Sequence, residues 1–217
     1  MFDFIKIGEV PKTSWSSEKT FNLKPRLKTL IALVVGLILF GLGEALLVTS
    51  QIGVSPWTAL GQGLANVSEL GLGLTTFLIS VFVLFLWIPL KQKPGVGTII
   101  DIFLVGTVAD LIIPNFPLSE NIFVSLLLIF CGIILIGAGT AIYVGGNLGV
   151  GPRDGIMVGL EDKGLKIGTA RNIIELLAFL TGWLLGGLVG YVTILFVIGI
   201  GPVVQKVLPY VDMRNNV

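Results

Sequence analysis

Long apolar runs separated by short polar segments make up most of the chain after residue 29. Six of these runs are long enough, or nearly so, to cross the roughly 30 Å apolar core of a bilayer as helices. None alternates apolar and polar residues as barrel strands do, and lipid offers no partner to an unpaired backbone. The pattern therefore predicts an all-α membrane protein with six transmembrane helices over 30–48, 72–90, 96–113, 122–144, 173–185 with its flanks, and 189–208.

Lysine and arginine residues lie in alternate connections between these runs. They occur in 1–29, 91–95, 145–172 and after residue 205, and are missing from 49–71, 114–121 and 186–190. Because cytoplasmic loops carry the excess of Lys and Arg, the pattern predicts that both termini are cytoplasmic. We expect a basic cytoplasmic tail over 1–29, which lacks the apolar core of a secretory signal, an integral membrane domain over 30–209 and a cytoplasmic tail over 210–217.

The composition limits the chemistry. Of the 217 residues, 54% are hydrophobic and 12% are charged, the net charge is +1, and the mean hydropathy is +0.97. A nearly neutral chain of this kind is not expected to bind nucleic acid. The absence of histidine and the single cysteine, Cys131, exclude a disulfide framework and the usual zinc sites. With no nucleophile–base pair and no metal-ligand cluster in the sequence, we expect neither an enzyme nor a bound cofactor.

The chain resembles itself at a shift of about 96 residues. The pattern Gly-x4-Gly-x-Gly-x-Ala occurs at 36–45 and 132–141, and Gly-Val-Ser-Pro at 53–56 is matched by Gly-Val-Gly-Pro at 149–152. These matches predict a duplication with three crossings in each copy. Because three is an odd number, the second copy must be inverted, which is a recurring plan of secondary transporters. The two repeats would cover about 30–114 and 122–209.

Each repeat contains a glycine-proline junction that ends one helix and begins a short second one. Glycine, as at Gly53 and Gly149, permits backbone angles that other residues avoid. Ser55 suits the N-cap position, and proline, as at Pro56 and Pro152, suits the first helical turn. The junctions therefore predict short helices immediately after them.

Two interpretations of these short helices, over 56–67 and 152–162, remain open. Each helix either lies flat in the membrane interface, with Trp57 as an anchor at headgroup level, or re-enters the membrane as a half-helix facing a central cavity. The free N–H groups of a re-entrant N-terminus would suit an anionic group.

Ionisable residues inside the apolar runs are candidates for a functional site. Glu44 interrupts the first run. Asp101 and Asp110 lie on opposite sides of the third helix, because nine residues correspond to about two and a half helical turns. Asp110 shares a face with Gly106, and small residues mark close helix contacts, so we expect Asp110 to face protein. The alternative is that Asp110 belongs to a solvated helix end, because it lies near the outer boundary of the membrane.

Charged residues in the second half make the two repeats chemically unequal. Arg153 and Asp154 stand in the second junction, where the first junction has no charge. Arg153 would hold a carboxylate or phosphate group or follow the positive-inside rule. Arg171 and Glu175 are four residues apart, and we expect them to form a structural ion pair.

Four motifs, GLG at 41–43, GVSPW at 53–57, PGVGT at 94–98 and GVGPRD at 149–154, resemble those of the YczE/YitT-type family of bacterial multi-pass membrane proteins. The similarity extends over about 30–209. It implies a multi-pass protein of the bacterial cytoplasmic membrane and implies no substrate or functional residue. Leu74-Thr75 departs from the Gly-Thr pair seen at residues 168–169.

Our leading hypothesis is a small-solute transporter, and the alternative is a membrane-embedded regulatory or interaction protein that presents its basic tail. The expected partners are the lipid bilayer, a small or anionic solute, and a second copy of the chain in a homo-oligomer. The candidate substrate-binding residues are Glu44, Gly53, Ser55, Asp101, Gly149, Arg153 and Asp154.

Overall fold

A computed structural model describes residues 13–211, apart from the side chains of residues 72, 73, 209 and 211. This part of the chain forms eight α-helices and one 3₁₀ turn and contains no β-strand. The ends of the predicted tails, 1–12 and 212–217, lie outside the described residues. In chain order the elements are α1 (Leu27–Thr49), α2 (Pro56–Ser68), α3 (Leu72–Leu90), α4 (Val96–Ile112), η1 (Ile113–Asn115), α5 (Ile122–Val144), α6 (Pro152–Glu161), α7 (Ile167–Leu184) and α8 (Tyr191–Val211).

Every apolar run that predicts a helix forms one, and both short helices follow their junctions. Among the described residues, four segments are long and apolar enough to cross a membrane by length and composition: Leu27–Thr49, Val96–Asn115, Ile122–Val144 and Tyr191–Leu208. The other two predicted crossings, α3 and α7, are helical but do not meet that criterion. In α3 the apolar segment is the shorter Leu74–Leu90.

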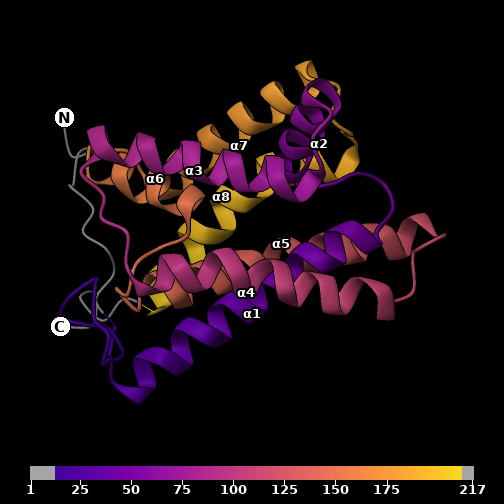
Figure 1. The fold of residues 1–217 in the computed structure, drawn as a ribbon. Coiled ribbons are helices and arrows are strands. Elements are labelled where there is room, and N and C mark those ends of the chain that lie inside the picture. The colour runs from indigo at the N-terminus through magenta and orange to yellow at the C-terminus, as the bar shows by residue number, and fades with distance from the viewer. Residues whose placement is uncertain (1–12, 212–217) are drawn as a thin grey trace, which may run out of the picture.

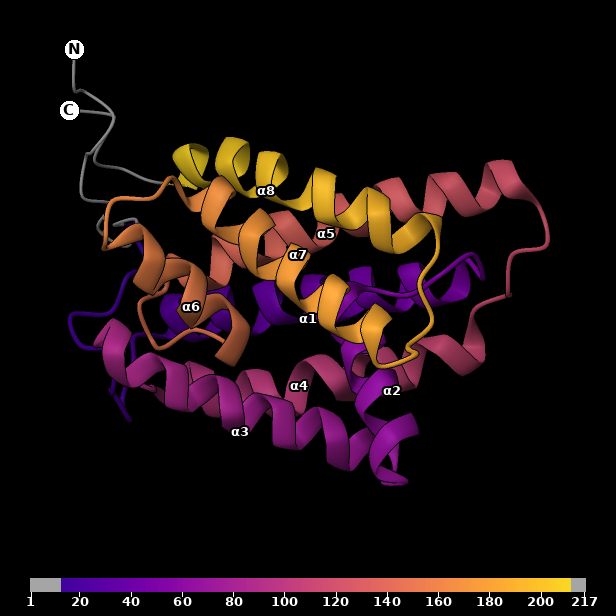
Figure 2. The same ribbon diagram turned by 90° about the horizontal axis from the view of Figure 1, so that it is seen from above.

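Helices α1 and α5 pack against each other along the middle of the bundle (Figures 1 and 2). Their contacts are reciprocal and antiparallel. A Cβ added to Gly36 would come within 2.8 Å of the Gly139 carbonyl oxygen, and one added to Gly43 within 2.7 Å of that of Gly132. Only glycine at these positions allows the two backbones to approach so closely.

The two junctions make matching contacts with the opposite repeat. The Gly97 N–H donates to the Leu148 carbonyl at 2.7 Å, and the Val192 N–H donates to the Ile52 carbonyl at 3.4 Å. The glycine that follows each carbonyl has a positive φ, +139° at position 53 and +101° at position 149. A side chain at either position would be strained, which explains the glycine in both copies.

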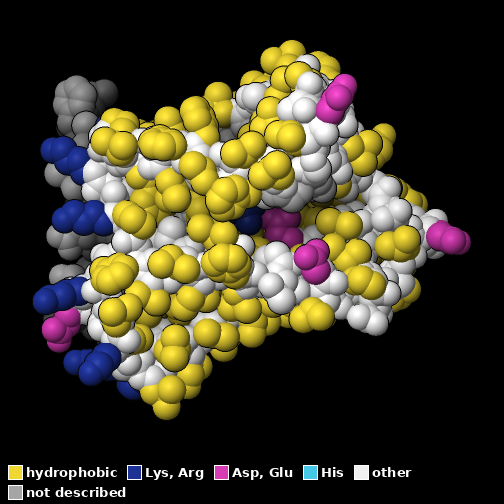
Figure 3. Space-filling model, viewed as in Figure 1, with side chains coloured by type: hydrophobic (Ala, Val, Ile, Leu, Met, Phe, Trp, Pro, Cys, Tyr) yellow, Lys and Arg dark blue, Asp and Glu magenta, His cyan; other side chains and the backbone are white. Residues whose placement is uncertain are grey.

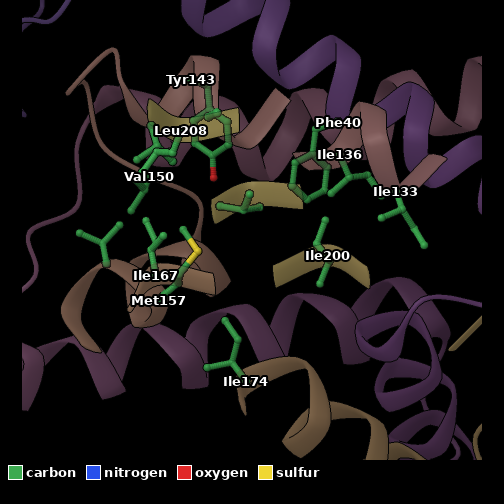
Figure 4. Close-up of a cluster of buried hydrophobic side chains, with 14 of the residues drawn as sticks. Phe40, Ile133, Ile136, Tyr143, Val150, Met157, Ile167, Ile174, Ile200 and Leu208 are labelled. Atoms are coloured by element: carbon green, nitrogen blue, oxygen red, sulfur yellow. The ribbon is translucent and has the colours of Figure 1, made fainter. Parts of the chain in front are cut away.

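The core lies between α1, α5, α6, α7 and α8. Figure 4 shows Phe40 of α1 beside Ile136 of α5, and the Tyr143 hydroxyl pointing towards the middle of the cluster. The outer surface is also apolar: many large hydrophobic side chains are exposed, and they cover the face seen in Figure 3. Such a surface would associate in water and is suited to contact with lipid.

The expectation that Asp110 faces protein is wrong. Asp110 and Gly106 are both exposed, and a Cβ at Gly106 would have no heavy atom within 4 Å. Their face of α4 does not pack on another helix, because α4 contacts α1 through its other side, where Gly97 and Thr98 are buried.

Candidate functional site

The first turn of α6 places two charged residues inside the protein. Pro152 begins the helix, so Arg153 and Asp154 follow directly from the constrained junction. The Trp87 indole of α3 donates to the Pro152 carbonyl at 2.8 Å, which anchors this turn from the side. Asp154 is buried completely.

Arg153 joins α6 to α1. Its Nη1 donates to Glu44 Oε1 at 3.2 Å, and its guanidinium carbon lies 4.4 Å from the centre of the Phe40 ring. Phe40 and Glu44 are one helical turn apart, so α1 presents a ring and a carboxylate to the same cation. The side chains of Arg153 and Glu44 remain 19% and 12% exposed.

Asp154 and Arg171 form the buried centre of the site. Asp154 accepts hydrogen bonds from the Tyr143 hydroxyl of α5 and from Nη1 of Arg171 of α7. The Tyr143 hydroxyl in turn accepts from the Gly151 N–H at 3.2 Å. Arg171 Nη2 also lies 2.9 Å from Glu175 Oε1, which confirms the predicted ion pair. One guanidinium therefore serves two carboxylates in a water-poor interior.

The first junction reaches the same cluster. Trp57, in the first turn of α2, donates from its indole nitrogen to Glu175 Oε1 at 3.1 Å. The N-terminal turns of both short helices thus meet at one group of charged residues. Within residues 13–211, Arg171 Nε and Nη2 and Glu175 Oε2 are buried without a hydrogen-bond partner. The ion pair between Arg171 Nη2 and Glu175 Oε1 lacks hydrogen-bond geometry.

Asp101 of α4 completes the cluster. Its carboxylate faces the backbone of Gly151, where an added Cβ would come within 2.5 Å of Asp101 Oδ2. Arg153, Asp154 and Arg171 are its charged neighbours. Asp101 takes part in none of the ion pairs that the structure describes within residues 13–211.

The structure brings four of the seven predicted site residues together, namely Glu44, Asp101, Arg153 and Asp154. The remaining three shape the junctions: Gly53 and Gly149 supply the positive φ angles, and Ser55 occupies the N-cap position of α2. The Ser55 hydroxyl lies 3.0 Å from the Thr58 hydroxyl and does not cap a backbone N–H.

Four residues of the cluster were not predicted as site residues: Trp57, Tyr143, Arg171 and Glu175. The sequence suggested an ion pair between Arg171 and Glu175 but not their partners on other helices, which are Asp154 for Arg171 and Trp57 for Glu175. Tyr143 could have been noticed in the sequence, because it places a hydroxyl group where its counterpart in the first repeat is the apolar Leu47. For Trp57 the sequence offered no indication of a role in the cluster beyond its position in the first junction.

A hollow opens between α3 and α4. Figure 3 shows it as a recess in the apolar face, with dark blue and magenta side chains visible inside it. The packing around it is unequal, since α7 lies against α8 in the second repeat while α3 and α4, their counterparts, do not pack closely. The exposed fractions of Arg153 and Glu44 accord with an opening of this kind.

Comparisons with known proteins agree with a membrane protein. The model of a family of unknown function, DUF6198, matches residues 27–209. An uncharacterized protein of Haemophilus influenzae is 39% identical over 207 residues, covering 92% of this chain and 91% of that protein. The uncharacterized membrane protein YczE of Bacillus subtilis is 30% identical over 177 residues, covering 80% and 82%. The uncharacterized protein YyaS of the same organism is 28% identical over 183 residues, covering 82% and 91%. No solved structure matches the chain significantly.

Proposed function

Since the chain belongs to the DUF6198 family of YczE-like membrane proteins, whose description assigns no activity, we propose a function from its own residues. We propose that it is a small-solute permease of the bacterial cytoplasmic membrane. The observation that carries this proposal is the meeting of two short-helix N-termini at one buried charge cluster.

Two inverted three-helix repeats are part of the proposal. Reciprocal contacts support them: the pair Gly36–Gly139 becomes the pair Gly132–Gly43 when every position is moved to its counterpart. The hydrogen bonds from Gly97 to Leu148 and from Val192 to Ile52 are related in the same way. An axis in the membrane plane would generate this relation, as it does in many secondary transporters.

The charge distribution supports the orientation with both termini in the cytoplasm. Lys and Arg side chains gather at one end of the bundle, where α1 and α4 begin and α6 lies, whereas α2 lies at the other end (Figures 1 and 3). Basic residues concentrate on the cytoplasmic side of membrane proteins. We therefore place the end with α6 inside the cell and the end with α2 outside.

We interpret α2 and α6 as re-entrant half-helices. Arg153 at the start of α6 touches Phe40, which lies near the middle of the 23-residue helix α1. A helix lying flat in the interface would not bring its first turn to that depth. Irregular backbone is tolerated in a membrane where protein or a water-filled cavity surrounds it, and the buried junctions meet this condition.

Transport also requires a route that opens on each side in turn. The hollow between α3 and α4 supplies an opening in the first repeat, and the packing of α7 on α8 closes the equivalent place in the second. If the repeats exchange these two arrangements, the cluster becomes accessible alternately from either side. The unequal packing of the two repeats is therefore expected of one state in a transport cycle.

The charges of the cluster bear on the solute. Both guanidiniums already contact carboxylates, so a cationic or zwitterionic solute fits the site better than the anion that a helix N-terminus alone would attract. The alternative function, presentation of the tail to partners, is less favoured. Residues 13–17 are tied down, with Ser16 Oγ donating to the Gly145 carbonyl at 2.6 Å and the Trp15 indole donating to that of Ile142 at 3.2 Å.

Uptake by proteoliposomes tests the proposal. The panel should contain cationic, zwitterionic and anionic solutes, each measured with an imposed proton gradient and by counterflow. We expect uptake of at least one solute by the wild type, and its loss in Glu44→Gln and Arg153→Ala. Asp110→Asn and Arg26→Ala are matched controls on exposed positions and should transport normally. No uptake or counterflow of any solute by the folded wild-type protein would refute the permease.

A further inference from the structure

The buried cluster contains more negative than positive groups. Two guanidiniums, those of Arg153 and Arg171, face four carboxylates. If every group were ionised, the interior would hold an excess of two negative charges. An uncompensated charge in a low-dielectric interior is expensive, and such groups bind a proton or a cation instead of remaining bare. The carboxylates belong to Glu44, Asp101, Asp154 and Glu175.

A second observation, independent of the charge count, indicates a missing proton. Glu175 is fully buried, and its Oε1 takes both the Trp57 indole and the contact with Arg171. Its Oε2 has no hydrogen-bond partner within residues 13–211. A buried carboxylate oxygen without a donor carries a desolvation cost that protonation removes. Oε2 of Glu175 is thus one place in the cluster where a proton can bind.

Asp101 differs from Asp154 and Glu175 in its burial. Its residue is only partly buried, whereas Asp154 and Glu175 are 0% exposed. The position that matches Asp101 in the second repeat is Phe196, which is buried and apolar. The fold therefore does not require a carboxylate at this place, and in the part of the chain that the structure describes Asp101 forms no ion pair that would fix its charge.

We propose that the cluster is a proton-binding site, with Asp101 as the group that exchanges its proton with water, and that this site couples solute movement to the proton gradient. The coupling rests on the proposed permease function, whereas proton binding does not. A proton from water bonds to a carboxylate oxygen of Asp101, and the same O–H bond breaks on release. The groups facing Asp101 are Tyr143 from α5, Arg153 and Asp154 from α6, and Arg171 from α7. Glu44 from α1 joins the cluster through its pair with Arg153.

Protonation is measured directly by infrared spectroscopy. The purified full-length protein, folded in lipid nanodiscs, is titrated with acid and base while the C=O stretch of protonated carboxylic acids is recorded. We expect the wild type to show this band at neutral pH and to lose it reversibly in alkaline buffer. Asp101→Asn should lose one carboxylic acid equivalent of the band, and Asp110→Asn, on the same helix but exposed, should keep it.

A conservative variant keeps the test valid if Asp101→Asn does not fold. Asp101→Glu should retain the titrating band at a shifted frequency, because glutamic and aspartic acids absorb differently. A wild type without a protonated carboxylic acid at neutral pH, or an Asp101→Glu band identical to that of the wild type, would overturn the inference. Solute uptake without the band would leave the permease standing and remove its proton site. If Asp101→Asn loses one carboxylic acid equivalent of the band but the wild type takes up no solute, the result would support proton binding and refute the permease.

Discussion

Replacement of Arg171 by methionine removes the only cation among residues 13–211 that contacts both Asp154 and Glu175. Arg171 and Glu175 are 0% exposed as side chains and Asp154 is 1% exposed, so water cannot take the place of the guanidinium. Methionine is similar in length and flexible enough to fill most of the space that is vacated. The expected loss of stability therefore comes chiefly from two buried carboxylates left without a positive partner.

Breaking a buried ion pair by removing one partner costs about 3–5 kcal/mol. At about 1.4 kcal/mol for each factor of ten, Arg171→Met should lower the folding equilibrium constant by roughly two to four powers of ten. The double variant Arg171→Met/Glu175→Gln should recover part of this loss, since one of the two uncompensated carboxylates is gone. Arg26→Met is the matched control, because Arg26 lies 3.8 Å from Glu18 in a pair that is exposed on both sides.

The assay is reversible unfolding of the purified protein in mixed micelles with rising concentrations of sodium dodecyl sulfate, followed by circular dichroism. The exposed pair should contribute nothing measurable, so Arg26→Met should unfold with the wild type. If Arg171→Met unfolds as late as Arg26→Met, the carboxylates are not buried as described. If the double variant is less stable than the single variant, uncompensated charge is not the cause of the loss.

Two further predictions use the same unfolding assay. Gly139→Leu should cost about 1–3 kcal/mol or more, because its Cβ would lie 2.5 Å from the Gly36 carbonyl oxygen and backbone atoms cannot rotate away. The control is Gly106→Leu, which lies in open space and should leave the stability unchanged. Equal losses of stability in both variants would contradict the packing of α1 on α5. Trp87→Phe should cost about 1–3 kcal/mol by removing the buried hydrogen bond from the indole to the Pro152 carbonyl at the start of α6. Trp183→Phe, at an exposed position of α7, is its control, and an unchanged Trp87→Phe would contradict the anchoring of that turn.

The helices and junctions could be predicted from the sequence because their signals are local. The apolar run over 122–144 ends where α5 ends, and Pro56 and Pro152 begin α2 and α6 as their place in the junctions predicts. Glycine at 53 and 149 has the positive φ for which glycine is suited. These features depend on a few neighbouring residues, so tertiary packing did not need to be known.

The cluster could be predicted only in part, because its contacts join distant segments. Glu44 and Arg153 are 109 positions apart, and Trp57 and Glu175 are 118 apart. Helical periodicity shows which residues share a face but not which helix that face meets. The same limitation explains the error at Asp110. Gly106, one turn away, was interpreted as a packing site, although within residues 13–211 no heavy atom lies within 4 Å of a Cβ placed there.

The central claim is that two inverted repeats place the ends of α2 and α6 on opposite sides of the membrane. It is tested most directly by single cysteines at Glu69 and Lys163, the exposed ends of the two half-helices, in a Cys131→Ser background. A membrane-impermeant thiol reagent applied to intact cells should label position 69 and spare position 163 until the membrane is opened. Labelling of both positions from the same side would contradict the inverted arrangement and the half-helices that meet within it.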